Sequence, residues 1–231
     1  MKIVAANFKT NHNRSITASY VTELNKFLED DKRERKVFVF PPATALDNFD
    51  GKTIVGAQNA YPAQNGAFTG EIGVDQLSEF GINTILIGHS ERRHVLGETQ
   101  ESIAEKYEYY RELDFNIIYC IGEPLEVREQ GNKELLEYLD AQLVGIDLNY
   151  SKLVVAYEPV WAIGTGLTPT NHDIELIHYS LREKISAPLL YGGSVKVNNS
   201  EEIMQIDNVD GVLVGGAALH VEDFKQIIKN S

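Results

Sequence analysis

The stretch KLVVAYEPVWAIGTG, residues 152–166, joins two patterns that together indicate the fold. Its first half is a short valine-rich run of the kind that forms a strand buried on both faces, and the run stops at an ionisable residue, Glu158. Its second half is an apolar loop that begins at Pro159 and ends in Gly-Thr-Gly. The rest of the chain must explain why a carboxylate follows a core strand.

Apolar runs of this kind recur along the chain, and we interpret each as a buried parallel strand. The eight runs are residues 2–8, 36–40, 53–58, 84–89, 116–122, 152–158, 188–193 and 211–216. Helix-like stretches lie between them, among them residues 15–30, 99–113, 133–144 and 171–185. Thr170 and Asn171 are N-cap candidates for the last of these.

The regular alternation predicts an α/β protein, a single-domain (β/α)8 TIM barrel with eight parallel strands over residues 1–231. Its active site would lie at the C-terminal ends of the strands. The alternative is an open doubly wound sheet. It is disfavoured because no early strand carries a G-x-G-x-x-G turn, and Pro169 stands where the third glycine of GTGLTP would be.

Composition excludes several classes of partner. The formal net charge of -13 argues against nucleic-acid or anionic-membrane surfaces, which require a basic face. The single cysteine, Cys120, cannot form an intramolecular disulfide, and no stretch reads as a signal peptide or membrane span. We therefore expect a cytoplasmic protein. His89 and His94 lack a third ligand nearby, so a zinc site is not expected.

Polar residues at the predicted strand ends are the candidates for function. Glu158 ends an apolar strand, so desolvation would raise its pKa towards that of a useful general base. Pro159 would restrict its backbone. A salt-bridged carboxylate at the barrel rim is the alternative interpretation. His89 precedes a predicted helix start, which would favour a neutral ring able to donate a hydrogen bond, although a lone histidine is more often structural.

A cation and two glycine pairs complete the candidate set. Lys9 follows the first strand, where it would concentrate an anionic substrate locally in an acidic protein, unless it is an ordinary solvated lysine. The glycines of YGGS and VGG, after the seventh and eighth strands, would let backbone N–H groups approach a phosphate, helped by a helix beginning near Ala217. Tight turns are the alternative reading of either pair. Together these groups suit proton abstraction beside the carbonyl of a phosphorylated sugar.

The strand ends, read in order, resemble the triosephosphate isomerase family. The motifs that carry the resemblance are NFKTN (7–11), AQN (57–59), GAFTGE (66–71), GHSERR (88–93), CIGE (120–123), AYEPVWAIGTG (156–166), YGGSV (191–195) and GVLVGGAAL (211–219). They span the whole chain, and GHSERR and YEPVWAIGTG are the most specific. The resemblance implies the interconversion of dihydroxyacetone phosphate and D-glyceraldehyde 3-phosphate, in glycolysis and gluconeogenesis, without a metal or organic cofactor.

The resemblance also implies roles for individual residues. Glu158 would be the base, His89 the donor that polarises the carbonyl, and Lys9, with Asn7 beside it, the group that stabilises negative charge. Glu91 and Cys120 would be supporting residues, the latter as a buried thiol rather than a nucleophile. The implied phosphate ligands are the backbone N–H groups of Gly164, Ser194, Gly215 and Gly216. The implied lid is Pro159, Val160, Trp161, Ala162, Ile163, Gly164, Thr165 and Gly166.

A homodimer is implied too, because GAFTGE resembles the loop that inserts near the partner's active site in this family. Thr69 would then approach the partner's Asn7 or the partner's Glu91. The chain departs from the family's common NWKMN at Phe8 and Thr10, which bears on details of the interface, and its short length leaves a tetramer open.

Two other classes of function fit the sequence less well. A Schiff-base aldolase would require a buried lysine at a strand end, whereas the sixth strand ends in Glu158 and Lys9 is the only strand-end lysine found. A barrel retained only as a scaffold would be expected to lack one catalytic group, whereas Asn7, Lys9, His89 and Glu158 are all present.

Overall fold

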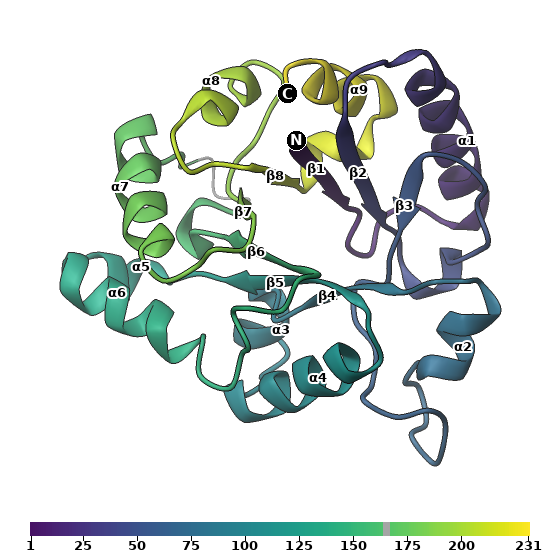
Figure 1. Ribbon diagram of the computed structural model, residues 1–231, viewed down its shortest axis with the longest axis horizontal. Helices are drawn as coiled ribbons and strands as arrows, with labels where there is room; N and C mark the ends of the chain where they lie inside the picture. The colour runs from purple at the N-terminus through teal and green to yellow at the C-terminus, as the bar shows by residue number, and fades with distance from the viewer. Residues whose placement is uncertain (164–166) are drawn as a thin grey trace.

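The predicted strands pair in parallel to form a nearly closed barrel with helices around it, which confirms the predicted (β/α)8 architecture (Figure 1). The computed structural model describes residues 1–163 and 167–231. The strands in this part of the chain are β1 (Lys2–Asn7), β2 (Arg35–Phe40), β3 (Thr53–Val55), β4 (Thr84–Ile87), β5 (Asn116–Ile121), β6 (Leu153–Tyr157), β7 (Leu189–Tyr191) and β8 (Gly211–Val214). Their order in the sheet is β3-β2-β1-β8-β7-β6-β5-β4.

The two ends of this sheet meet beyond the short strand β3. The N–H of Ala57 donates to the carbonyl of Thr84 at 2.9 Å, and the N–H of Leu86 donates to the carbonyl of Ala57 at 2.9 Å. These bonds form an isolated parallel bridge between Ala57 and Ile85. The barrel is therefore joined here by a single bridge, and β3 is shorter than the predicted run of residues 53–58.

Helices alternate with the strands as predicted, with ends that differ by a few residues. They are α1 (Arg14–Asp30), α2 (Val74–Glu79), α3 (Ser90–His94), α4 (Gln100–Glu112), α5 (Leu125–Arg128), α6 (Asn132–Ala141), α7 (Asn171–Arg182), α8 (Ser200–Gln205) and α9 (Val221–Lys229). Short 3-10 turns are η1 (Ala43–Ala45), η2 (Val160–Ala162) and η3 (Gly216–Leu219). Thr170 caps α7 in a capping box with Asp173, as its position before a helical stretch predicted.

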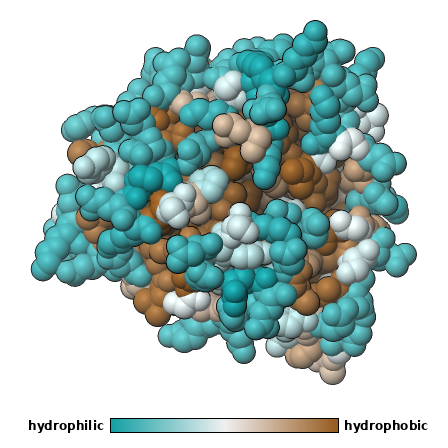
Figure 2. Space-filling model, in the orientation of Figure 1, coloured by the Kyte–Doolittle hydropathy of each residue, from teal (hydrophilic) through white to brown (hydrophobic). Residues whose placement is uncertain are grey.

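The core has two layers because successive side chains on a strand point to opposite faces. One set fills the barrel interior: Ile3, Ala5, Phe38, Phe40, Leu86, Ile118, Cys120, Ala156, Leu190 and Leu213. The other, larger set lies between the strands and the helices and includes Val4, Ala6, Val155 and Tyr157. Figure 2 shows hydrophobic residues gathered towards the middle of one face, with hydrophilic residues around the rim.

None of the helices in the described residues is both long enough and apolar enough to cross a bilayer.

Candidate functional site

The alternation within strands directs two polar side chains into the mouth of the barrel. Ala5 and Ala156 belong to the interior set. Asn7 lies two residues after Ala5 and Glu158 two residues after Ala156, so their side chains point to the same face as these alanines. Asn7 is 6% exposed and Glu158 only 2%. The same periodicity that builds the core therefore places an amide and a carboxylate above it.

Seven of the predicted catalytic and phosphate-binding residues line one cavity of about 340 Å³. They are Asn7, Lys9, His89, Glu158, Ser194, Gly215 and Gly216. Of the predicted lid, Ile163 lines this cavity, while Gly164, Thr165 and Gly166 lie outside the described residues. The chain thus brings together groups that are up to 209 positions apart, because all of them follow the carboxyl ends of strands.

Three other predicted residues, Glu91, Cys120 and Thr69, do not line this cavity. Glu91 lines an adjoining cavity of about 720 Å³, which shares Asn7, Lys9 and His89 with the first. Cys120 is completely buried in the barrel interior, and burial, together with the nearby Glu158 carboxylate, raises its pKa well above the ordinary value. Thr69 is exposed on the loop between β3 and α2 and lines neither cavity.

The Glu158 carboxylate is held by two donors. Its Oε1 lies 3.2 Å from Nε2 of His89, and its Oε2 accepts a hydrogen bond from the N–H of Ser90 at 3.3 Å. Complete burial acts to raise the pKa of Glu158, but the interaction with His89 and the Ser90 N–H lower it below its usual value. The carboxylate is therefore ionised at neutral pH in this arrangement.

His89 is the N-cap residue of α3, and its ring is oriented by that helix. Nδ1 accepts a hydrogen bond from the N–H of Glu91 at 3.2 Å, so the neutral ring carries its proton on Nε2, the nitrogen that faces Glu158. Burial lowers the pKa of His89, but the Glu158 carboxylate outweighs burial and raises it.

Both pKa directions are the reverse of those predicted from sequence. The sequence indicates burial for Glu158 and a helix start for His89, but it does not reveal that the two side chains touch. An ion pair or charged hydrogen bond at 3.2 Å favours the ionised form of each partner and here exceeds the effect of desolvation.

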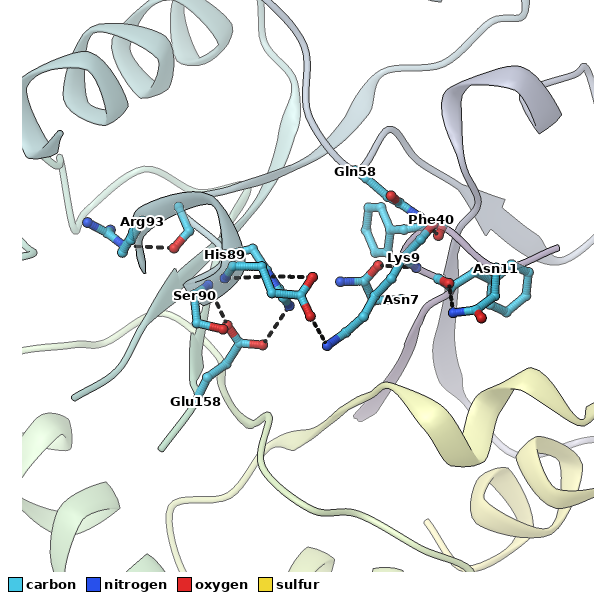
Figure 3. A network of polar contacts seen from close by, with 12 residues as sticks. Asn7, Lys9, Asn11, Phe40, Gln58, His89, Ser90, Arg93 and Glu158 are labelled. Carbon is cyan, nitrogen blue, oxygen red and sulfur yellow. Dashed lines mark hydrogen bonds and ion pairs between the residues drawn. The ribbon is translucent and has the colours of Figure 1, made fainter. Parts of the chain in front are cut away.

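Lys9 reaches the same region from β1 through an unusual backbone conformation. Its φ of 53° lies in the left-handed region, and the Oδ1 of Asn7 accepts a hydrogen bond from its N–H at 3.0 Å. The Nε2 of Gln58 donates to the carbonyls of Lys9 and Phe40, both at 2.8 Å. These bonds fix the turn, and the ammonium group forms an ion pair with Glu91. Figure 3 shows the side chains of Glu158, His89 and Lys9 converging.

The glycine-rich strand ends form the other wall of the cavity. A β-carbon placed on Gly216 would find no described atom within 4 Å, and one on Gly215 would meet only the Cε of Lys9, at 3.7 Å. Both peptide groups are therefore open to the cavity. The predicted helix near Ala217 is the short 3-10 turn η3, and the regular helix α9 begins only at Val221.

Sequence reasoning missed several residues that shape this site. Lys196 lines the cavity beside the glycines, and a lysine after YGGSV gives no signal of its own. Glu123 is fully buried, and its Oε1 accepts hydrogen bonds from Nε1 of Trp161 at 2.9 Å and from the Tyr157 hydroxyl at 3.1 Å. Burial raises the pKa of Glu123. Glu123 follows the fifth predicted strand and belongs to the CIGE motif, but no role was predicted for it.

Comparison with known proteins places this architecture in a family. The family model for triosephosphate isomerase matches residues 2–231. A protein named triosephosphate isomerase from Sulfurimonas denitrificans is 61% identical over 222 residues, or 96% of this chain and 92% of that protein. Proteins of the same name from Sulfurovum sp. and Wolinella succinogenes are 58% and 53% identical, each covering 98% of this chain and 99% of its own. The barrel, the residues at its mouth and these matches agree, and the chain belongs to the triosephosphate isomerase family.

Proposed function

We propose that Glu158, His89 and Lys9 perform the proton transfers of this enzyme, and that the ends of β7 and β8 hold the substrate's phosphate. The reaction follows from the family: the protein is an aldose–ketose isomerase that interconverts dihydroxyacetone phosphate and D-glyceraldehyde 3-phosphate, a step of glycolysis and gluconeogenesis. The observation that carries the assignment of roles is the convergence of the three side chains, from three strands, on one cavity.

Glu158 is the base. Its carboxylate removes a proton from the carbon next to the substrate carbonyl and returns it to the neighbouring carbon, so that an enediolate forms and collapses without a net change in atoms. Substrate between Glu158 and His89 would replace their mutual contact. Burial would then act on the carboxylate with less opposition and raise its pKa, which makes it a stronger base for the proton that it must take.

His89 is the electrophile. The N–H of Glu91 donates a hydrogen bond to Nδ1, so the neutral ring keeps its proton on Nε2. His89 lines the cavity, and this Nε2–H can donate to the substrate's carbonyl oxygen. The same nitrogen can pass protons between the two oxygens of the enediolate. A donor fixed in direction before the reaction begins stabilises developing charge without reorganisation.

The Lys9 ammonium group stabilises the negative charge of the enediolate, and Asn7 positions Lys9. The hydrogen bond from the Lys9 N–H to Asn7 Oδ1 supports a left-handed backbone that a lysine adopts only when its surroundings stabilise it. Glu91 pairs with the ammonium group and is the supporting acid. Cys120 supports the base differently, as a buried neutral thiol next to Glu158.

The phosphate ligands are the backbone N–H groups of Ser194, Gly215 and Gly216. The open glycine peptides on the cavity wall support this role, since the lack of a side chain at Gly215 and Gly216 leaves room for an anion to approach their N–H groups. Gly164 completes the set by family resemblance alone, since it lies outside the described residues.

Residues 159–166 form the lid. Its described part is tied to the end of β5, because Val160 N–H donates to the carbonyl of Glu123 at 3.0 Å and Trp161 donates to the Glu123 carboxylate. Ile163 lines the cavity, which supports a role for the lid in excluding water from Glu158.

The enzyme is a homodimer, in the cytoplasm. The loop between β3 and α2 projects beyond the body of the protein (Figure 1) and is stiffened by the Tyr61 and Phe68 rings, whose centroids are 4.2 Å apart. Phe68, Val95 and Leu96 are 42%, 75% and 64% exposed, and the last two line the 720 Å³ cavity. A partner's loop filling that cavity would cover this apolar surface and bring the partner's Thr69 near Asn7 or Glu91.

The catalytic assignment is tested by a coupled assay of D-glyceraldehyde 3-phosphate conversion with Glu158→Asp. A shorter side chain moves the carboxylate by about 1 Å, so turnover should fall on the order of 100-fold while the fold is kept. Parent-level turnover in the variant would show that Glu158 is not the base.

Sedimentation of Thr69→Arg tests the interface. An intact dimer of full activity would show that Thr69 does not make the proposed contact with the partner subunit.

A further inference from the structure

The residue that follows α6, Gln142, holds both polar groups of a single glycine. The N–H of Gly122 donates to Oε1 of Gln142 at 2.8 Å, and Nε2 of Gln142 donates to the carbonyl of Gly122 at 3.0 Å. Gln142 is itself 6% exposed, and its own carbonyl accepts a hydrogen bond from the Tyr119 hydroxyl at 2.5 Å. The amide is thus a buried clamp on the residue after β5.

Gly122 in turn lies flush against the backbone of Glu158. A β-carbon placed on Gly122 would lie 1.8 Å from the carbonyl oxygen of Glu158 and 3.4 Å from its Cα. On the preceding residue, the carbonyl of Ile121 accepts a hydrogen bond from the N–H of Glu158 at 2.7 Å. The backbone at the end of β5 therefore fixes the position and orientation of the Glu158 backbone.

We infer that Gln142 is a positioning residue for Glu158: by fixing the peptide groups of Gly122, it keeps the carboxylate where proton transfer requires it. Gln142 does not line the cavity, so it acts through Gly122 and not on substrate. Without the amide, a buried N–H and a buried carbonyl lose their partners, and the strand end must shift to regain them. This inference rests on the proposed role of Glu158 as the base.

The protein contains a matched control for this clamp at the other end of the barrel. Asn25 of α1 is 8% exposed, and its Oδ1 accepts a hydrogen bond from the N–H of Thr53 while its Nδ2 donates to the carbonyl of Asp50, both at 2.8 Å. It is the same kind of clamp at the start of β3, away from the cavity. Removing it should cost similar stability without moving Glu158.

The test compares Gln142→Met with Asn25→Leu, each measured at a temperature where circular dichroism shows it folded. In Gln142→Met, kcat should fall about tenfold, since displacements below 1 Å cost less than the 100-fold expected for a full ångström. KM and the inhibition constant for inorganic phosphate should stay within about twofold, because the proposed phosphate ligands follow β7 and β8 and not β5. Asn25→Leu should keep kcat within about twofold. Equal kcat values in the two variants, or a loss that appears in KM and phosphate inhibition instead, would overturn the inference.

Gln142→Glu gives a second readout that also serves if Gln142→Met does not fold. A protonated carboxyl group can donate to the Gly122 carbonyl as the amide does, whereas an ionised one places two acceptors face to face. The kcat ratio of Gln142→Glu to the parent should therefore rise as pH is lowered, and Asn25→Asp should show no such rise. A ratio independent of pH would count against positioning.

The same series separates this inference from the function on which it rests. If Glu158→Asp turns over at the parent rate, the base assignment fails whatever the Gln142 variants do. If Glu158→Asp is slow while both Gln142 variants match their Asn25 controls, Glu158 remains the base and only the positioning role of Gln142 is lost.

Discussion

Strand β1 carries a lysine at its start and another just beyond its end, and the two have opposite surroundings. At the start, the ammonium group of Lys2 donates to the carbonyls of Met204 and Val209, both at 2.6 Å, and burial lowers its pKa. Beyond the end, the ammonium group of Lys9 faces a cavity and pairs with a half-exposed carboxylate, Glu91.

This difference extends to the two ends of the barrel. At the N-terminal end, Lys2 and Asn25 form hydrogen bonds with backbone groups of neighbouring segments. At the C-terminal end, His89 and Glu158 contact each other across the mouth of the barrel. We therefore expect changes at the first end to reduce stability and changes at the second to reduce activity.

The largest effect should come from Lys9→Met. Loss of the positive charge beside the enediolate should lower kcat about 100- to 1,000-fold, the usual loss when a group that stabilises transition-state charge is removed. The free energy of unfolding should change little, because the ion pair with Glu91 is partly exposed. Steady-state kinetics and urea unfolding of the same preparation measure both quantities. A variant that is stable and fully active would show that the Lys9 charge is not needed for catalysis.

The next largest effect is a loss of stability at acidic pH that leaves activity unchanged, and it comes from His178. Burial lowers the pKa of His178, on α7, to about 4, against 6.5 for an ordinary histidine. As pH falls from 6.5 to 4 the unfolded chain binds a proton that the folded chain does not, so stability should fall, by up to about 3 kcal/mol.

His178→Gln should remove this acid-dependent loss. Thermal unfolding of both proteins between pH 7 and pH 4.5 measures it, and parallel curves for the two proteins would show that the loss originates elsewhere. Activity per folded molecule should be the same in parent and variant, because His178 does not line the cavity.

A smaller loss should follow Lys2→Met. Two carbonyl groups lose a charged donor, and such bonds contribute about 1.5 to 3 kcal/mol each, partly replaced by water at this half-buried position. We expect unfolding to be easier by about 2 kcal/mol with kcat unchanged. Lys2→Arg, which keeps the charge and donors, is the control. A fall in kcat without a loss of stability would contradict the division between the two ends.

The smallest effect should come from Lys196→Gln. In the described chain the Lys196 ammonium group has no hydrogen bond or ion pair, and the residue lines the cavity beside the glycines that follow β7. Removing this charge from a protein of net charge -13 should raise KM about threefold at low salt, and less at high salt because ions screen the attraction. A KM that does not change at low ionic strength would show that Lys196 does not attract substrate.

Much of the fold and the candidate site could be predicted from single segments. Valine-rich runs such as LVVAY indicate buried strands because no polar residue interrupts them, and the order of strands and helices then predicts a barrel. Glu158, His89 and Lys9 stood out because each is an ionisable group next to such a run. The predicted ends of strands and helices were less accurate: β3 stops at Val55, and η3 replaces the helix expected near Ala217.

Contacts between distant segments could not be predicted in this way. The residues that reach the mouth of the barrel can be named from the sequence, because alternation along a strand is a local property of the chain. The contact between Glu158 and His89, which reverses the pKa directions expected for each alone, and the clamp of Gln142 on the glycine beside Glu158 are visible only in the folded barrel. Both depend on distances of a few ångströms between groups, and these distances are set only when the strands close into a barrel.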